Sequence, residues 1–183
     1  LSGVNTYSGG TTVTSGGLLK ITDANNLGSG ALTLQNGALE TSATSLSLDI
    51  NLAGSVGILK TNTDMDFYGT LIGSADFLKI GSGTLTLHNT NPSFSGDTVV
   101  MESGSYIALS DPNALGNGRL ILAEGGGLKV LANTNELRPV QISSGVGVIN
   151  TGASTVKSSG NITGPSGLAA LLGTTGRLRK EGS

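Results

Sequence analysis

The chain has 183 residues and a formal net charge of -2, and it contains 30 glycines but no cysteine. Aromatic residues make up only 3% of it, so the Leu, Ile and Val side chains can fill a narrow core but not a wide one. The charge excludes the basic surface of a nucleic-acid-binding protein, and no run of about 18 apolar residues is present for membrane insertion.

Short apolar runs with a period of two follow one another along the chain and predict β-strands that bury one face. The clearest runs are 32–34, 46–52, 85–87, 128–130, 140–142 and 146–148. In the run 46–52 we expect Leu48 to face inward and Asp49 to face solvent. Clusters of Gly, Asn and Ser separate the runs and are typical of tight corners.

Helical spacing is not sustained over three turns anywhere in the sequence. Asp111 followed by Pro112 predicts a single helical turn, because Asp is a favoured N-cap and Pro is tolerated at the first helical position. Asp23 occupies the same position in an earlier stretch, and we expect both aspartates to bond their own turns rather than calcium. A further single turn is predicted at 168–172.

The stretch 7–34 is repeated at 94–122 with a one-residue slip, and a period this long determines the architecture. The shared positions are Tyr7, Gly9, Leu27, Gly28, Gly30, Leu32 and Leu34 in the first copy and Phe94, Gly96, Leu115, Gly116, Gly118, Leu120 and Leu122 in the second. We therefore predict one continuous domain cut from a longer polypeptide. Its first unit covers 1–83, and its second covers 84–183 with an insertion near 166–176.

Two all-β folds fit this pattern. Asn36-Gly37 is a hairpin signal, which favours a sandwich. The long repeat and the shortage of large core residues favour a parallel β-helix, in which rungs of roughly 20–25 residues stack around a thin core. We predict the β-helix, with roughly eight rungs and about four rungs in each unit. Strand edges at its two ends predict end-to-end self-association.

Three segments resemble the passenger-associated transport repeat, also called the autotransporter-associated β-strand repeat. They are NTYSGGTTV at 5–13, LGSGALTL at 27–34 and GSGTLTL at 81–87. The resemblance implies a right-handed parallel β-helix that leaves the cell through its own C-terminal outer-membrane β-barrel. It also implies a structural stalk segment that is secreted or displayed on the bacterial surface. Such passengers include adhesins and virulence factors, which bind a host-cell or bacterial surface ligand.

No residue is predicted to be catalytic, to bind a cofactor or to hold a metal ion. Asp64 and Asp66 alternate on a strand-like stretch and would suit glycoside cleavage. A carbohydrate-active enzyme or a sugar-binding module is therefore the alternative function. His88 is the single histidine and no serine lies in a nucleophile motif, so we expect a surface residue rather than a triad member. Tyr7 and Phe94 are expected to be packing anchors at equivalent corners.

Overall fold

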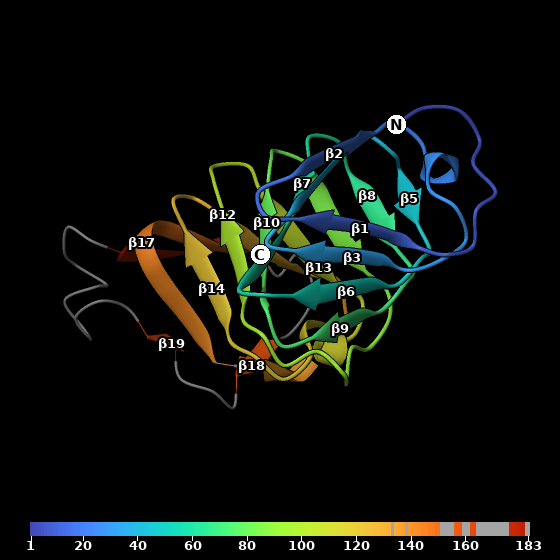
Figure 1. Ribbon diagram of the computed structural model, residues 1–183. Coiled ribbons are helices and arrows are strands. Elements are labelled where there is room, and N and C mark those ends of the chain that lie inside the picture. The colour runs from blue at the N-terminus through green and yellow to red at the C-terminus, as the bar shows by residue number, and fades with distance from the viewer. Residues whose placement is uncertain (133, 138, 151–155, 159–161, 164–175, 182–183) are drawn as a thin grey trace.

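The computed structural model describes residues 1–132, 134–137, 139–150, 156–158, 162–163 and 176–181. Short strands and two single-turn 3-10 helices, η1 (Ala24–Asn26) and η2 (Pro112–Leu115), follow one another as a coil (Figure 1). The strands are β1 (Thr11–Thr14), β2 (Leu18–Ile21), β3 (Leu32–Gln35), β4 (Ala38–Thr41), β5 (Ser45–Leu46), β6 (Ile50–Ala53), β7 (Val56–Thr61), β8 (Met65–Phe67), β9 (Leu71–Gly73), β10 (Asp76–Ile80), β11 (Thr84–Leu87), β12 (Thr98–Met101), β13 (Tyr106–Leu109), β14 (Leu120–Ala123), β15 (Gly127–Val130), β16 (Thr134–Leu137), β17 (Val140–Asn150), β18 (Val156–Ser158), β19 (Ile162–Thr163) and β20 (Gly176–Glu181).

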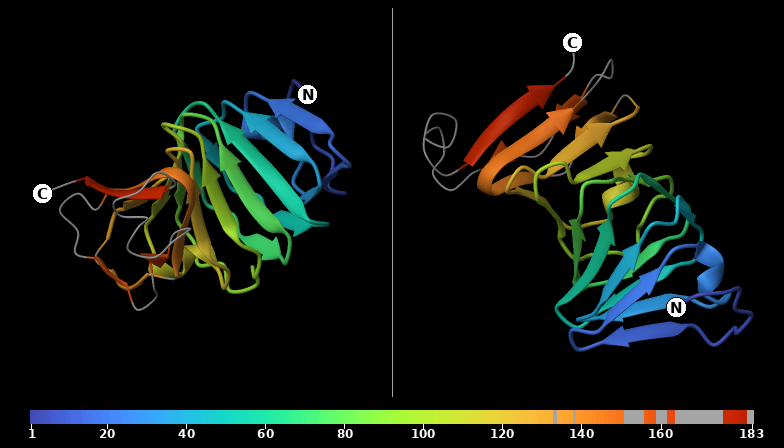
Figure 2. Two further views of the ribbon diagram at one scale, coloured as in Figure 1. Left: turned by 90° about the vertical axis from the view of Figure 1, so that its left-hand side faces the viewer. Right: turned by 90° about the horizontal axis from the view of Figure 1, so that it is seen from above.

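Three long parallel sheets run along the coil, and β16 and β18 form a further parallel pair. Sheet A contains β1, β3, β6 and β9 in that order, and sheet B contains β2, β4, β7, β10, β12, β14, the start of β17 and β19. Sheet C contains β5, β8, β11, β13, β15, the end of β17 and β20. Figure 2 shows the strands stacked one upon another along the coil. The long strand β17 bends from sheet B into sheet C, which joins the two sheets.

The fold is the predicted parallel β-helix, and every strand pairing of the described residues is parallel. Paired residues lie one turn apart in sequence, as in Leu59 with Lys79 and Val100 with Leu122. The coil makes about six turns, slightly fewer than the roughly eight expected. Asn36 does not begin a hairpin: it turns a corner with a φ of 56° and accepts a hydrogen bond from Ser55 N at 2.7 Å.

The core is a column of aliphatic side chains inside the coil. In β7 and β10 the inward positions are buried and the outward positions are partly exposed. Leu46, Ile50 and Leu52 are buried as predicted. Leu48 is only half-buried, because the first turn carries η1 where later turns carry a strand of sheet C. No helix in the described part of the chain is long and apolar enough to cross a membrane.

The two sequence repeats share their local geometry. Ser29 N donates a hydrogen bond to Tyr7 O at 3.0 Å, and the equivalent Asn117 N donates to Phe94 O at 2.8 Å. In both copies an aspartate caps the following 3-10 turn. Asn25 N donates to Asp23 at 2.8 Å and Asn113 N donates to Asp111 at 2.7 Å, which confirms the capping predicted from sequence.

The copies nevertheless occupy different faces of the coil. β1 pairs within sheet A, whereas its counterpart β12 pairs within sheet B. Four turns after β1 the chain reaches Phe94, which bridges to Gly73 of sheet A, and β12 lies one face further on. The repeat is thus four turns and one face long. The predicted turn at 168–172 and all but the last residue of the insertion near 166–176 lie outside the described residues.

Candidate interaction surface

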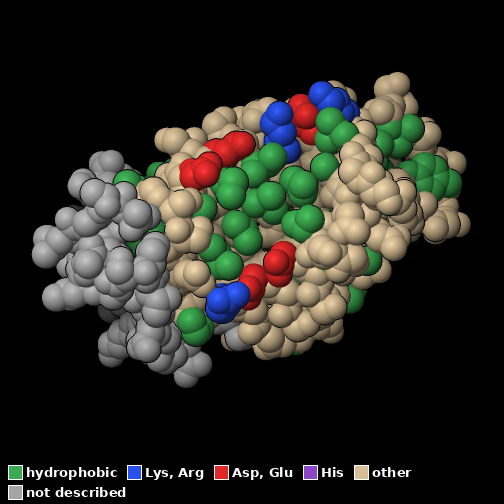
Figure 3. Space-filling model, turned by 60° about the vertical axis from the view of Figure 1, so that its left-hand side comes forward, with side chains coloured by type: hydrophobic (Ala, Val, Ile, Leu, Met, Phe, Trp, Pro, Cys, Tyr) green, Lys and Arg blue, Asp and Glu red, His purple; other side chains and the backbone are tan. Residues whose placement is uncertain are grey.

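The outer face of sheet B carries apolar side chains in successive turns. One outward ladder, with each residue paired to the next, consists of Leu18, Ala38, Ile58, Leu78, Val99 and Ile121. Ile80 and Met101 widen this ladder on one side. We call Ile58, Leu78, Ile80, Val99, Met101 and Ile121 the apolar face. Its side chains are half-buried because each packs against the turns above and below, which leaves a flat surface (Figure 3).

Carboxylates border the apolar face on both sides, as Figure 3 shows. We call these residues the acidic margins, namely Asp76 and Asp97 where the strands begin and Glu102 and Glu124 where they end. Asp97 Oδ2 accepts hydrogen bonds from Arg119 Nη2 at 2.6 Å and Nε at 3.1 Å. These bonds hold the pKa of Asp97 below its ordinary value and raise that of Arg119.

The N-terminal end of the same face carries charges of both signs. Glu40 lies 3.3 Å from Lys20 and 3.6 Å from Lys60, so one carboxylate is shared by two ammonium groups of the neighbouring turns. These residues occupy one outward ladder, in which Lys20 pairs with Glu40 and Glu40 with Lys60. The net charge of the face therefore changes sign along the coil, from basic at Lys20 to acidic at Glu124.

A buried lysine lies directly beneath the apolar face. Lys79 points inward from β10, and its Nζ lies 2.9, 2.9 and 2.8 Å from the carbonyl oxygens of Ile80, Gly81 and Gly83. Ser105 Oγ lies 3.3 Å from the same atom. Burial lowers the pKa of Lys79 to about 8, although the nearby Glu102 and Asp64 favour its charged form.

A second polar cluster lies where three strands of sheet C end. His88 Nε2 lies 2.7 Å from Asp66 Oδ1, and Ser110 Oγ lies 3.5 Å from His88 Nδ1. The Tyr68 ring stacks on the imidazole with centroids 4.4 Å apart. Sequence reasoning missed this cluster, although Tyr68, His88 and Ser110 each follow the last residue of a strand and are spaced by one turn. That spacing is the signal that would have found it.

This arrangement contains the residue types of a hydrolytic triad without its geometry. The 3.5 Å separation is at the limit of a hydrogen bond, and Ser110 lies at the end of a regular strand. Its amide donates to Leu87 O within the ladder and is not free to stabilise an oxyanion. The cluster therefore supports a structural role, in which the imidazole is held between Asp66 and the Tyr68 ring.

The acids weighed for glycoside cleavage have separate partners. Asp64 Oδ1 accepts a hydrogen bond from Thr84 N at 2.7 Å, which is the main reason that its pKa is lowered. Asp66 contacts His88 instead. Within the part of the chain that the structure describes, no three His, Asp or Glu side chains are grouped to hold a metal ion. Each of the two carboxylates thus has a hydrogen-bond partner of its own on a neighbouring turn.

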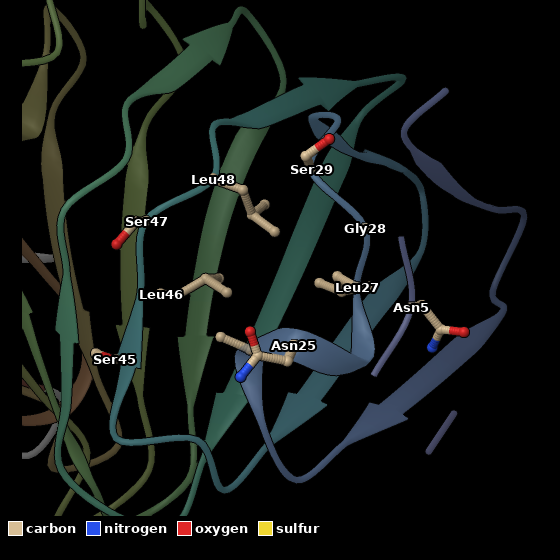
Figure 4. Close-up of a pocket in the computed structure, with 10 residues that line it drawn as sticks. Asn5, Asn25, Leu27, Gly28, Ser29, Ser45, Leu46, Ser47 and Leu48 are labelled. Atoms are coloured by element: carbon tan, nitrogen blue, oxygen red, sulfur yellow. The ribbon is translucent and has the colours of Figure 1, made fainter. Parts of the chain in front are cut away.

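A groove of about 450 Å³ opens near the N-terminus, between η1 and β5. Figure 4 shows Leu27, Leu46 and Leu48 pointing toward one another inside it. Leu27 and Leu46 are also members of the core, so the groove floor is the top of the hydrophobic column. Asn and Ser side chains complete its lining, and no charged side chain lines it.

The repeat positions divide between the core and the corners. Leu27, Leu32, Leu34, Leu115, Leu120 and Leu122 are all buried. Phe94 is completely buried as expected, whereas Tyr7 is 37% exposed and bonds Thr11 Oγ1 through its hydroxyl at 2.5 Å. Gly28, Gly30, Gly116 and Gly118 each lie against a neighbouring backbone segment, where a Cβ would collide. Gly9 has no such neighbour within 4 Å.

Comparison with known proteins finds a match to part of each repeat. The family model of the passenger-associated transport repeat matches residues 1–21 and 77–105, the segments that contain Tyr7 and Phe94. These two matched segments agree with the resemblance to the transport repeat that the sequence shows. No solved structure matches the chain.

Among curated proteins, the chain is similar to the adhesin BmaC autotransporter of Brucella suis biovar 1 (strain 1330). The two are 35% identical over 105 residues, which is 55% of this chain. The chain spans only 3% of the length of that relative.

Proposed function

We propose that this chain is a structural stalk segment of a Gram-negative autotransporter passenger and supports export and surface display of an adhesin. The carrying observation is the unbroken parallel stacking of strands through sheets B and C, together with the two matched transport repeats. Each added turn buries apolar side chains on the turn before it, so folding outside the cell favours forward movement of the chain. The parent's C-terminal β-barrel would be the export partner, and a host-cell or bacterial surface molecule the adhesive partner.

A matched pair of substitutions in β3 tests the role in export. Leu34 is fully buried and Thr33 is an outward neighbour in the same strand. In the parent passenger with its own barrel, Leu34→Asp places a charge in the column and should lower surface display several-fold. Thr33→Asp should leave display near the wild-type level. Surface display is measured by protease accessibility on intact cells, and equal display of the two variants would refute the proposal.

A carbohydrate-active enzyme has less support. The acids Asp64 and Asp66 bind separate partners, and the relative named above is called an adhesin autotransporter rather than an enzyme. Incubating the purified chain with bacterial and plant polysaccharides and assaying released oligosaccharides addresses this alternative directly. Turnover would favour the enzyme over the stalk.

A further inference from the structure

We propose that the apolar face is a docking site for an amphipathic α-helix of a partner protein whose apolar stripe is flanked by Lys or Arg. The proposal rests on the surface exposure that the proposed function implies, and it names the chemistry of the adhesive partner. It does not depend on the role of the stalk in export.

The first argument is the shape of the face. The ladder from Leu18 to Ile121 crosses five strand spacings, a length of about 24 Å. A helix of about 16 residues has this length. Its turns are about 5.4 Å apart and the ladder residues are about 4.8 Å apart, so successive helical turns meet successive turns of the coil. A helix lying along the ladder can therefore contact apolar residues over its whole length.

The second argument is the width between the acidic margins. Asp97 and Glu102 flank β12, one directly before its first residue and one directly after its last, so they are at most about 17 Å apart along the strand direction. A helix about 10–12 Å wide fits between them, and long basic side chains on its flanks reach the carboxylates. An extended strand would direct its side chains toward and away from the face rather than sideways. The geometry thus favours a helix over a strand.

The third argument is charge. The acidic margins contain four carboxylates, and two cations, Arg119 and Lys60, also adjoin the apolar face, so the formal sum is -4 + 2 = -2. A basic partner is attracted to this part of the face and an acidic one is repelled. The same charges disfavour an anionic membrane, since its headgroups would meet the carboxylates.

The test measures direct binding of a peptide probe to the purified chain by fluorescence anisotropy. The probe is a labelled synthetic helix of about 18 residues with a Leu stripe flanked by Lys. We expect micromolar binding that weakens as salt is raised. A matched peptide with Glu in place of Lys should bind at least tenfold more weakly, and so should a Lys peptide with the same composition but a scrambled order.

Variants of the chain locate the site. Asp76→Asn with Glu124→Gln removes two margin charges and should weaken binding several-fold and reduce its salt dependence. The control, Asp23→Asn with Asp49→Asn, removes the same charge away from the face and should leave binding unchanged. Leu78→Ser on the face should also weaken binding several-fold, whereas Ile72→Ser on the outer face of sheet A should not. Circular dichroism checks that each variant is folded, and the charge variants decide the matter if Leu78→Ser unfolds.

Several outcomes would overturn the proposal. One is failure of the Lys helix to bind the chain, and another is equally tight binding of the Lys and Glu helices. Equal losses of affinity in the Asp76→Asn, Glu124→Gln variant and in its charge control would have the same consequence. Binding to vesicles of phosphatidylcholine and phosphatidylglycerol in place of the helix would also overturn it. Because the assay uses purified chain, any of these results leaves the export experiment unaffected, so the two proposals fail independently.

Discussion

Lys79 shows most clearly how a single residue departs from the pattern around it. Its inward ladder otherwise contains only aliphatic residues, namely Leu19, Leu39, Leu59, Val100, Leu122 and Ile142. The lysine is accommodated because the corner after β10 turns three carbonyl oxygens toward its Nζ. A buried ammonium of this kind is tolerated only when such acceptors replace its water.

The lowered pKa of Lys79 gives a testable dependence on pH. The pKa of Lys79 is about 8 in the folded chain, whereas the ordinary value of 10.5 applies to the unfolded chain. Between these two pH values the unfolded chain therefore binds more protons than the folded chain. The free energy of unfolding should therefore rise with pH across this window, by roughly 2–3 kcal/mol relative to a Lys79→Met variant. Urea denaturation of both proteins from pH 7 to pH 10.5 measures this difference, and parallel pH profiles would contradict it.

The corner glycines give a second prediction for single residues. A Cβ at Gly118 would lie 1.9 Å from Gly96 O, whereas a Cβ at Gly9 would meet nothing within 4 Å. Gly118→Ala should therefore lower the free energy of unfolding by about 1–3 kcal/mol or more. Gly9→Ala should change it by no more than about 0.5 kcal/mol. Urea midpoints for the two variants provide the comparison, and equal midpoints would mean that the stacked corners can separate at no cost.

At the scale of elements, the strand is the unit that neighbouring turns stabilise. β7 illustrates this: Leu59 is buried in the column, while Ile58 beside it is outward on the apolar face. A strand inside a sheet pairs with one strand above and one below, so β7 depends on β4 and β10. Stability in such coils is approximately a sum of neighbour terms.

This dependence predicts how a local defect spreads. Leu59→Asp should reduce hydrogen-exchange protection strongly in β7, β4 and β10 and much less in β14, three turns away from β7 in sheet B. Ile58→Asp, in which the same charge faces solvent, should leave the protection of β4 and β10 nearly unchanged. Mass spectrometry of exchanged peptides resolves these strands. A uniform loss of protection along the coil would show that it unfolds as one unit.

At the scale of the whole molecule, the length of the repeat decides where equivalent residues appear. Because the repeat spans four turns and one face, β12 lies on sheet B although its counterpart β1 lies on sheet A. Val99 and Met101 of the second copy thereby join the apolar face. Thr12 and Thr14, their counterparts in the first copy, lie outside it. The face is thus assembled from different parts of the two repeats.

The sequence by itself determined the class of fold. Alternation in runs such as 32–34 and 85–87 indicated which side chains are buried, and the shortage of aromatic residues indicated a narrow column. The repeat at 94–122 indicated a coil and its resemblance to autotransporter passengers. These features are local or periodic, so they can be recognised without knowing which turns touch.

Only the tertiary structure decided what lies on each face. Whether Tyr68, His88 and Ser110 meet, or whether Leu78 adjoins Val99, depends on the number of residues in each turn, and that number varies between corners. A difference of one residue moves a side chain to the opposite side of its strand. The number of residues in each turn also placed Lys79 inside the column and brought carboxylates to both edges of the apolar face. Alternation within a single strand does not reveal either arrangement.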